Sequence, residues 1–89
     1  MAHLTPEALK EKLNNAAKLV KIGEHYRYYR GGEYVVKELV LLEATTDVGV
    51  VYQSLEHNLV WVRVLDDWLA KVKSPNGQIV SRFTLATPI

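Results

Sequence analysis

The sequence predicts an α+β fold that is mainly β: a small half-open barrel of about five or six antiparallel strands, preceded by one helix. Two observations support this prediction. Apolar residues recur at helical spacing up to about residue 20, and from Glu24 the period falls to two while aromatic and β-branched residues become frequent. The strands that follow are short and recur roughly every 8–12 residues between turn signals, which is typical of a small barrel.

The N-terminal helix is expected over residues 6–20. Thr5 can cap the first backbone N–H groups, and Pro6 suits the first helical position. The apolar stripe is narrow and includes Ala16 and Ala17, so we expect the helix to pack closely on a flat surface.

A β-hairpin is expected next. Residues 25–30 form its first strand, Gly31-Gly32 form a tight turn with positive φ, and residues 33–44 form the returning strand. The polar pair Lys37-Glu38 interrupts the apolar pattern of the long strand and predicts a bulge or bend, which would let one strand serve two sides of a barrel. Another strand is expected over residues 48–55.

Beyond that bend, residues 39–42 are apolar on both faces, so both faces need cover. We expect Val40 and Leu42 to enter the barrel core, and Leu39 and Leu41 to receive the N-terminal helix. The alternative is a homodimer interface through Leu39, Leu41 or the helix, since monomers rarely leave large apolar patches bare.

The strand over residues 59–65 has the strictest alternation in the chain. Trp61 and Arg63 lie on one of its faces, and valines occupy the other. The residues expected to face the core are Val60, Val62 and Val64. Trp61 and Arg63 would then project together from the opposite face of the sheet.

Helical spacing returns briefly over residues 65–72, where Asp66 is expected to cap a short turn and Trp68 and Leu69 to plug one end of the barrel. A last hairpin is expected over residues 71–73 and 79–85, joined by a turn at residues 74–77. These elements fit a half-open barrel of the SH3-like kind, with a highly twisted antiparallel sheet carrying the helix on one face as the alternative.

The composition fits a single globular domain over residues 1–89, with 48% apolar and 24% charged residues. The net charge of +1 is too balanced to argue by itself for nucleic acid or an anionic membrane. Cysteine is absent, which excludes disulfides and thiolate chemistry. No signal-peptide pattern or membrane-length apolar run occurs, so a cytoplasmic location without a membrane partner is expected.

Four sequence blocks resemble the motifs of a known family. Residues 26–34 resemble its opening Y-R-H-[YF]-[KR]-G-x-x-Y, residues 50–52 its V-V-Y, residues 61–63 its W-V-R, and residues 82–83 its R-F. Spread over about residues 23–83, they resemble the small bacterial family called domain of unknown function 1653. This chain has Tyr28 where the family pattern has His, and Val64 where it has Pro. The resemblance implies a compact β-rich domain without an assigned activity, and it supplies no catalytic residue.

Trp61 and Arg63 form the first candidate binding site. An aromatic face beside a guanidinium suits stacking on a nucleobase, a peptide aromatic residue or a proline. The alternative is that Trp61 lies under the N-terminal helix or a loop, while Arg63 pairs with Glu33 or Glu38.

The tyrosine-rich hairpin is the second candidate site. Its residues are Tyr26, Arg27, Tyr28 and Tyr29, which with Arg30, Tyr34 and Tyr52 could form an aromatic and basic groove for single-stranded nucleic acid. Tyr26 and Tyr28 share a face of the strand while Tyr29 points away, so the cluster cannot form one surface. Cross-strand aromatic packing is the alternative.

No catalytic, metal or cofactor motif occurs. The three histidines, His3, His25 and His57, are dispersed without a second ligand at metal-binding spacing, so no zinc site is expected. The leading interpretation is a non-catalytic binding module for a protein or a short single-stranded nucleic acid. A structural or oligomerisation role is the alternative, and an enzyme acting on a small molecule near His57, Asp66 or Arg63 is the least favoured.

Overall fold

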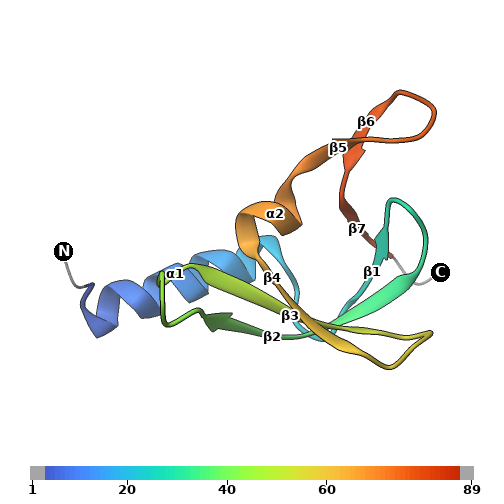
Figure 1. Ribbon diagram of the computed structural model, residues 1–89. Helices are drawn as coiled ribbons and strands as arrows, with labels where there is room; N and C mark the ends of the chain where they lie inside the picture. Colours follow the sequence, from blue (N-terminus) through green and yellow to red (C-terminus); the bar gives the residue numbers. More distant parts are fainter. Residues whose placement is uncertain (1–3, 87–89) are drawn as a thin grey trace.

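The computed structural model describes residues 4–86 (Figure 1). The elements in chain order are α1 (Pro6–Leu19), β1 (His25–Tyr28), β2 (Glu33–Leu41), β3 (Val48–Ser54), β4 (Val60–Val64), α2 (Leu65–Leu69), β5 (Lys71–Lys73), β6 (Ile79–Ser81) and β7 (Phe83–Leu85). Five strands form one antiparallel sheet in the order β4-β3-β2-β1-β7, and β5 pairs with β6 in a separate hairpin. Since β4 and β7 end the sheet without pairing with each other, the barrel is half open, and the predicted mainly β fold with an N-terminal helix is confirmed.

Helix α1 forms where its capping signals predict it. The Thr5 hydroxyl oxygen accepts a hydrogen bond from the Ala8 N–H at 3.1 Å, and Pro6 occupies the first helical position, where a missing N–H costs nothing. Val20 is extended and ends the helix one residue before the predicted boundary. No helix within residues 4–86 is both long and apolar enough to cross a membrane.

The first hairpin confirms two backbone predictions. Gly31 and Gly32 have φ angles of 107° and 94°, values that side-chain-bearing residues rarely adopt. The register between β2 and β3 shifts between Val36 and Glu38, which is the predicted bulge and leaves Lys37 outside the pairing. Strand β2 ends at Leu41 rather than near residue 44, because the chain turns back at once: the Thr46 N–H donates to the Leu42 carbonyl at 2.7 Å.

The core lies between α1 and the inner face of the sheet. Ala16 of α1 and Val20, which directly follows the helix, pack in one cluster with Leu39 of β2, and Leu41 packs against the same cluster. The small Ala16 side chain allows the helix to approach the sheet closely, as its narrow apolar stripe predicts. Leu39 is buried within this single chain and Leu41 is half-buried against the same cluster, as expected of residues that receive the helix. The alternative dimer interface stays a prediction.

The predicted inward direction of Val40 and Leu42 is wrong. Both are only half-buried and lie with Val62 on the outer face of the sheet, around Gly49. The bulge at Lys37 accounts for this, because it keeps Leu39 on the same inner face as Val36 and turns Val40 outward.

The faces of β4 are also the reverse of those predicted. Strand β4 pairs with β3 so that Trp61 lies opposite Tyr52 and Arg63 opposite Val50, both inward-facing residues. Val60 and Val62 therefore point outward and are 59% and 53% exposed. An alternating strand with two apolar faces has two possible orientations, and here the aromatic face is turned inward.

Helix α2 closes one end of the barrel with Trp68 alone. Trp68 is 3% exposed and stacks on Phe83 with ring centroids 3.7 Å apart and planes 5° apart. Leu69 is exposed rather than a plug. Asp66 is not the cap, because the helix follows β4 directly, with Val64 in the cap position and Asp66 inside the first turn.

The last hairpin is confirmed with one difference. The predicted strand over residues 79–85 is broken at Arg82, so β6 pairs with β5 while β7 returns to pair with β1. That return carries Phe83 into the centre of the barrel, where it meets residues from β1, β2, β3 and α2.

Candidate binding site

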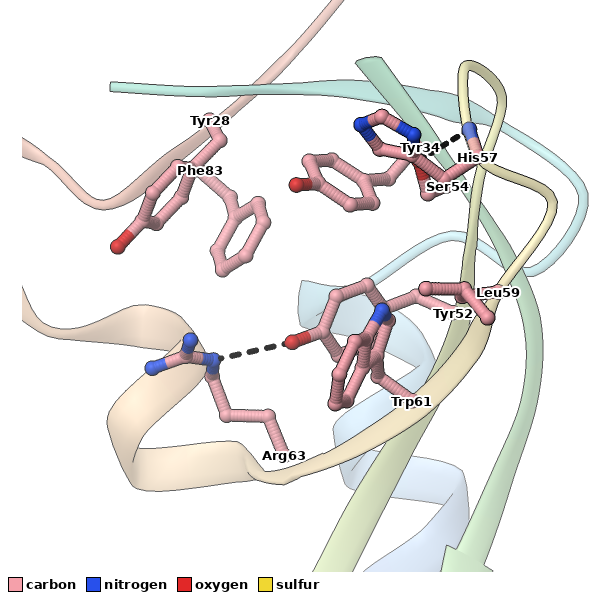
Figure 2. A pocket seen from close by; sticks show the side chains of 9 residues that line it. All are labelled: Tyr28, Tyr34, Tyr52, Ser54, His57, Leu59, Trp61, Arg63 and Phe83. Atoms are coloured by element: carbon pink, nitrogen blue, oxygen red, sulfur yellow. Dashed lines mark hydrogen bonds between the residues drawn. The ribbon is translucent and has the colours of Figure 1, made fainter. Parts of the chain in front are cut away.

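A cleft of about 310 Å³ opens on the inner side of the sheet, and we call it the aromatic cleft (Figure 2). Its residues come from the inner faces of β1, β2, β3, β4 and β7 and from the turn between β3 and β4. They are Tyr28, Tyr34, Tyr52, Ser54, His57, Leu59, Trp61, Arg63 and Phe83. None of these nine side chains is acidic.

Phe83 is the centre of the aromatic packing behind the cleft. Its ring centroid lies 5.1 Å from that of Tyr28, 6.0 Å from that of Tyr34 and 5.6 Å from that of Tyr52. Most of these pairs meet edge to face, the arrangement that aromatic quadrupoles favour. Because Phe83 also stacks on buried Trp68, the walls of the cleft are continuous with the core and are held in place by it.

The Arg63 guanidinium lies at one end of the cleft. Its Nε–H donates to the Tyr52 hydroxyl at 3.4 Å, and its Cζ atom lies 5.6 Å from the Phe83 ring centroid, a cation–π distance. Within residues 4–86 Arg63 forms no ion pair. No carboxylate of these residues therefore lies within ion-pair distance of the guanidinium.

Arg63 remains positively charged. Partial burial acts to lower its pKa, but the hydrogen bond to the Tyr52 hydroxyl and the nearby Tyr28 and Asp67 groups act in the other direction and raise the pKa of Arg63 above its ordinary value. An arginine whose pKa is raised does not lose its proton near neutral pH. The cleft thus combines aromatic walls with a permanent cation.

Trp61 is accessible from solvent. It is 52% exposed, so the alternative in which the helix or a loop covers it is wrong. Glu33, one of the proposed partners of Arg63, instead forms an exposed ion pair with Arg27 at 3.2 Å. Trp61 and Arg63 therefore lie together on the inner side of the sheet, next to the tyrosines rather than away from the core.

The predicted tyrosine groove is divided by the structure. Tyr28 lines the cleft, but Tyr26 is buried, with its hydroxyl accepting from the Lys21 N–H at 2.8 Å. Arg27 is exposed on the outer side of β1. Tyr29 lies in the turn after β1, where the Arg30 Cζ atom lies over its ring, 5.8 Å from the ring centroid.

Several cleft residues were not predicted as site residues. Phe83, Ser54 and Leu59 reach the cleft through strand pairing and through the turn after β3. His57 reaches it from the same turn, although the sequence offers it only as a candidate for acid–base chemistry. For Tyr52, the sequence contains one signal. Tyr52 follows Val48 and Val50 at alternate positions of the strand, so the three side chains are expected on the same face. No local signal indicates that Phe83, distant in sequence, fills the space between the tyrosines.

Residues 4–86 contain no group of three His, Asp or Glu side chains placed to hold a metal ion. His57 and Glu56 are both exposed, with Nε2 and the carboxylate 3.8 Å apart. His3 lies outside the described residues. The cleft is suited to stacking and to anion binding.

Fold and cleft together define a small half-open β-barrel whose concave side carries an aromatic cleft with one arginine. The chain belongs to the DUF1653 family: the sequence profile described as "Protein of unknown function (DUF1653)" matches residues 24–85. This confirms the resemblance predicted from the four sequence blocks. The matched region contains every residue that lines the cleft and excludes α1.

A solved structure supports the same assignment. The crystal structure of a DUF1653 protein from Bordetella bronchiseptica is similar to this chain, with a TM-score of 0.63 and 29% sequence identity. The similarity covers 75% of this chain and 92% of that chain. The comparison with functionally curated proteins gives no match.

Proposed function

We propose that this protein is a non-catalytic binding module that holds one aromatic side chain of a protein partner in the aromatic cleft, with Arg63 paired to a carboxylate beside that ring. The observation that carries the proposal is the half-exposed Trp61 ring next to a charged guanidinium that forms no ion pair within residues 4–86.

The shape and lining of the cleft favour a planar ring. A volume of about 310 Å³ is at the lower end of the range for ligand pockets, enough for one ring and its immediate substituents. Trp61, Tyr34 and Tyr28 offer aromatic edges and faces on different sides of that space (Figure 2). Each additional aromatic pair stabilises a complex by roughly 0.5–1.5 kcal/mol beyond area burial.

The charge of the cleft favours an anionic group on the ligand. A guanidinium presents its N–H groups as a planar fork that matches a carboxylate. Since the Arg63 Nε–H is taken by Tyr52, the two terminal nitrogens remain for the ligand. None of the nine lining side chains is acidic, and Asp67, whose charge acts on Arg63, forms no ion pair with it within residues 4–86.

A protein partner fits this site better than single-stranded nucleic acid does. Grooves for single strands follow several phosphates with a row of cations. The aromatic cleft has one arginine, the chain has a net charge of only +1, and nearby Arg27 is paired with Glu33. One cation beside one ring-sized space is the complement of a single aromatic residue with a neighbouring carboxylate.

NMR titration with N-acetyl-phenylalanine tests this proposal, with its neutral amide as the matched ligand. We expect both to shift the resonances of cleft residues, and the acid to bind more tightly. Arg63→Gln should weaken the acid about tenfold, since hydrogen bonds to charged groups contribute about 1.5–3 kcal/mol, and leave the amide unchanged.

Arg27→Gln is the control, because it removes the same charge outside the cleft. Equal loss of binding in both arginine variants would contradict a specific role for Arg63. If neither ring compound shifts the cleft while an oligonucleotide does, with binding that weakens steeply as salt rises, the partner is nucleic acid instead.

A further inference from the structure

Strand β4 is one edge of the five-stranded sheet and pairs only with β3 (Figure 1). Four consecutive apolar residues at this edge are each more than half exposed: Leu59, Val60, Trp61 and Val62. Proteins usually protect a sheet edge with lysine, proline, a bulge or a covering element. Strand β4 contains no proline or lysine, and its pairing with β3 is regular.

The free side of β4 presents unpaired backbone groups. The Leu59 carbonyl accepts from the Ser54 N–H at 2.8 Å, so the backbone groups of Leu59 point toward β3. In antiparallel pairing this direction alternates along the strand. Trp61 and Arg63 therefore also bond toward β3, while the N–H and C=O groups of the intervening valines point away from the sheet.

The sequence of β4 is self-complementary in one antiparallel register. With a two-fold axis at Val62, Val60 lies opposite Val64 of a second copy, and Trp61 lies opposite Arg63. Val62 then pairs with Val62 of the second copy through two backbone hydrogen bonds, and each Val60 lies opposite Val64, whose carbonyl, in the cap position of α2, accepts within that helix. On the inner side each Trp61 and the Arg63 of the other copy are cross-strand neighbours, an aromatic residue beside a cation.

We propose that two copies of this chain associate through antiparallel pairing of their β4 strands about a two-fold axis at Val62. The pairing joins two five-stranded sheets into one continuous sheet. The interface is isologous, so it closes as a dimer and does not propagate into fibres. Both aromatic clefts lie on the same side of the joined sheet, next to the axis. This proposal does not depend on the ligand of the cleft.

Sedimentation equilibrium from low micromolar to near-millimolar concentration tests the association. We expect a reversible rise in mass toward that of two chains. Val62→Lys places two like charges at the axis and should keep the chain monomeric at every concentration. Ile79→Lys, the same change at an exposed residue of β6, should leave the dimer intact. A wild-type monomer throughout, or a dimer that persists in Val62→Lys, overturns the proposal.

Cross-linking tests the register, since the natural chain has no cysteine. Hydrogen-bonded antiparallel partners have Cα atoms about 5.5 Å apart, within disulfide range. Val62→Cys should thus form an intermolecular disulfide under mild oxidation. In the matched variant Val60→Cys the two Cα atoms would be about 14 Å apart, so it should not cross-link. The register is overturned if both variants cross-link equally, or if Val62→Cys does not cross-link.

Discussion

The side chains around Gly49 in β3 leave no room for a larger residue at this position. Gly49→Ala therefore tests the packing of the outer face of the sheet. Its φ angle is not in the left-handed region, so backbone strain does not arise. A methyl group added at Gly49 would lie 2.9 Å from Val62 Cγ2, 3.3 Å from Val40 Cγ2 and 3.4 Å from Leu42 Cδ2. The first distance is too short for carbon atoms in contact, and Val62 is β-branched and has few rotamers available.

The expected loss of stability follows from two opposing effects. Overpacking costs about 1–3 kcal/mol, while replacing glycine by alanine at an allowed φ recovers about 0.4–1 kcal/mol from the unfolded state. We expect Gly49→Ala to lower the free energy of unfolding by about 1–2 kcal/mol. In a domain of this size that lowers Tm by about 5–10 °C.

Urea denaturation of Gly49→Ala, Val62→Ala and the double variant measures this effect and identifies its cause. Val62→Ala alone should cost little, because the side chain is half exposed. In the double variant it should restore most of the loss, giving a coupling energy of about 1 kcal/mol. A Gly49→Ala variant as stable as the wild type, or additive effects in the double variant, would refute the packing argument.

Three further substitutions test other parts of the fold by the same denaturation assay. Thr5→Ala removes the hydrogen bond to the Ala8 N–H and should cost about 1 kcal/mol; no change would mean that the cap does not hold α1. Phe83→Leu removes the stack on Trp68 and should cost about 2 kcal/mol, with unfolding still cooperative. Arg27→Gln breaks only an exposed ion pair and should change stability by less than about 0.5 kcal/mol, so a larger loss would contradict that assignment.

Local features of this fold could be predicted from the sequence because their causes are local. The Thr5 cap, the Gly31-Gly32 turn and the bulge at Lys37 each depend on residues that are neighbours in the chain. The helical turn near Trp68 belongs to the same group. The cap follows from a hydroxyl that bonds to nearby backbone and the turn from φ angles that few residues adopt, whereas the bulge and the helical turn are indicated by local changes in the apolar pattern.

The orientation of β4 could not be predicted in this way. Alternation defines two faces, and in β4 both are apolar enough to be buried, so the pattern alone does not say which one is inside. The choice depends on Phe83 and Trp68, which fill the concave side and offer partners to tyrosines rather than to valines. Trp61 and Arg63 were correctly paired as neighbours, but the surface they share became apparent only with the tertiary fold.

The two tryptophans of this chain differ in environment, and this gives the protein two separate optical signals. Trp68 is 3% exposed inside the core, whereas Trp61 is 52% exposed at the cleft. A ligand that covers Trp61 removes water from an indole and moves emission to shorter wavelength. Unfolding brings water to Trp68 and moves emission to longer wavelength. Occupancy of the cleft and loss of the fold therefore change the fluorescence of the unlabelled protein in opposite directions, and a single spectrum distinguishes them.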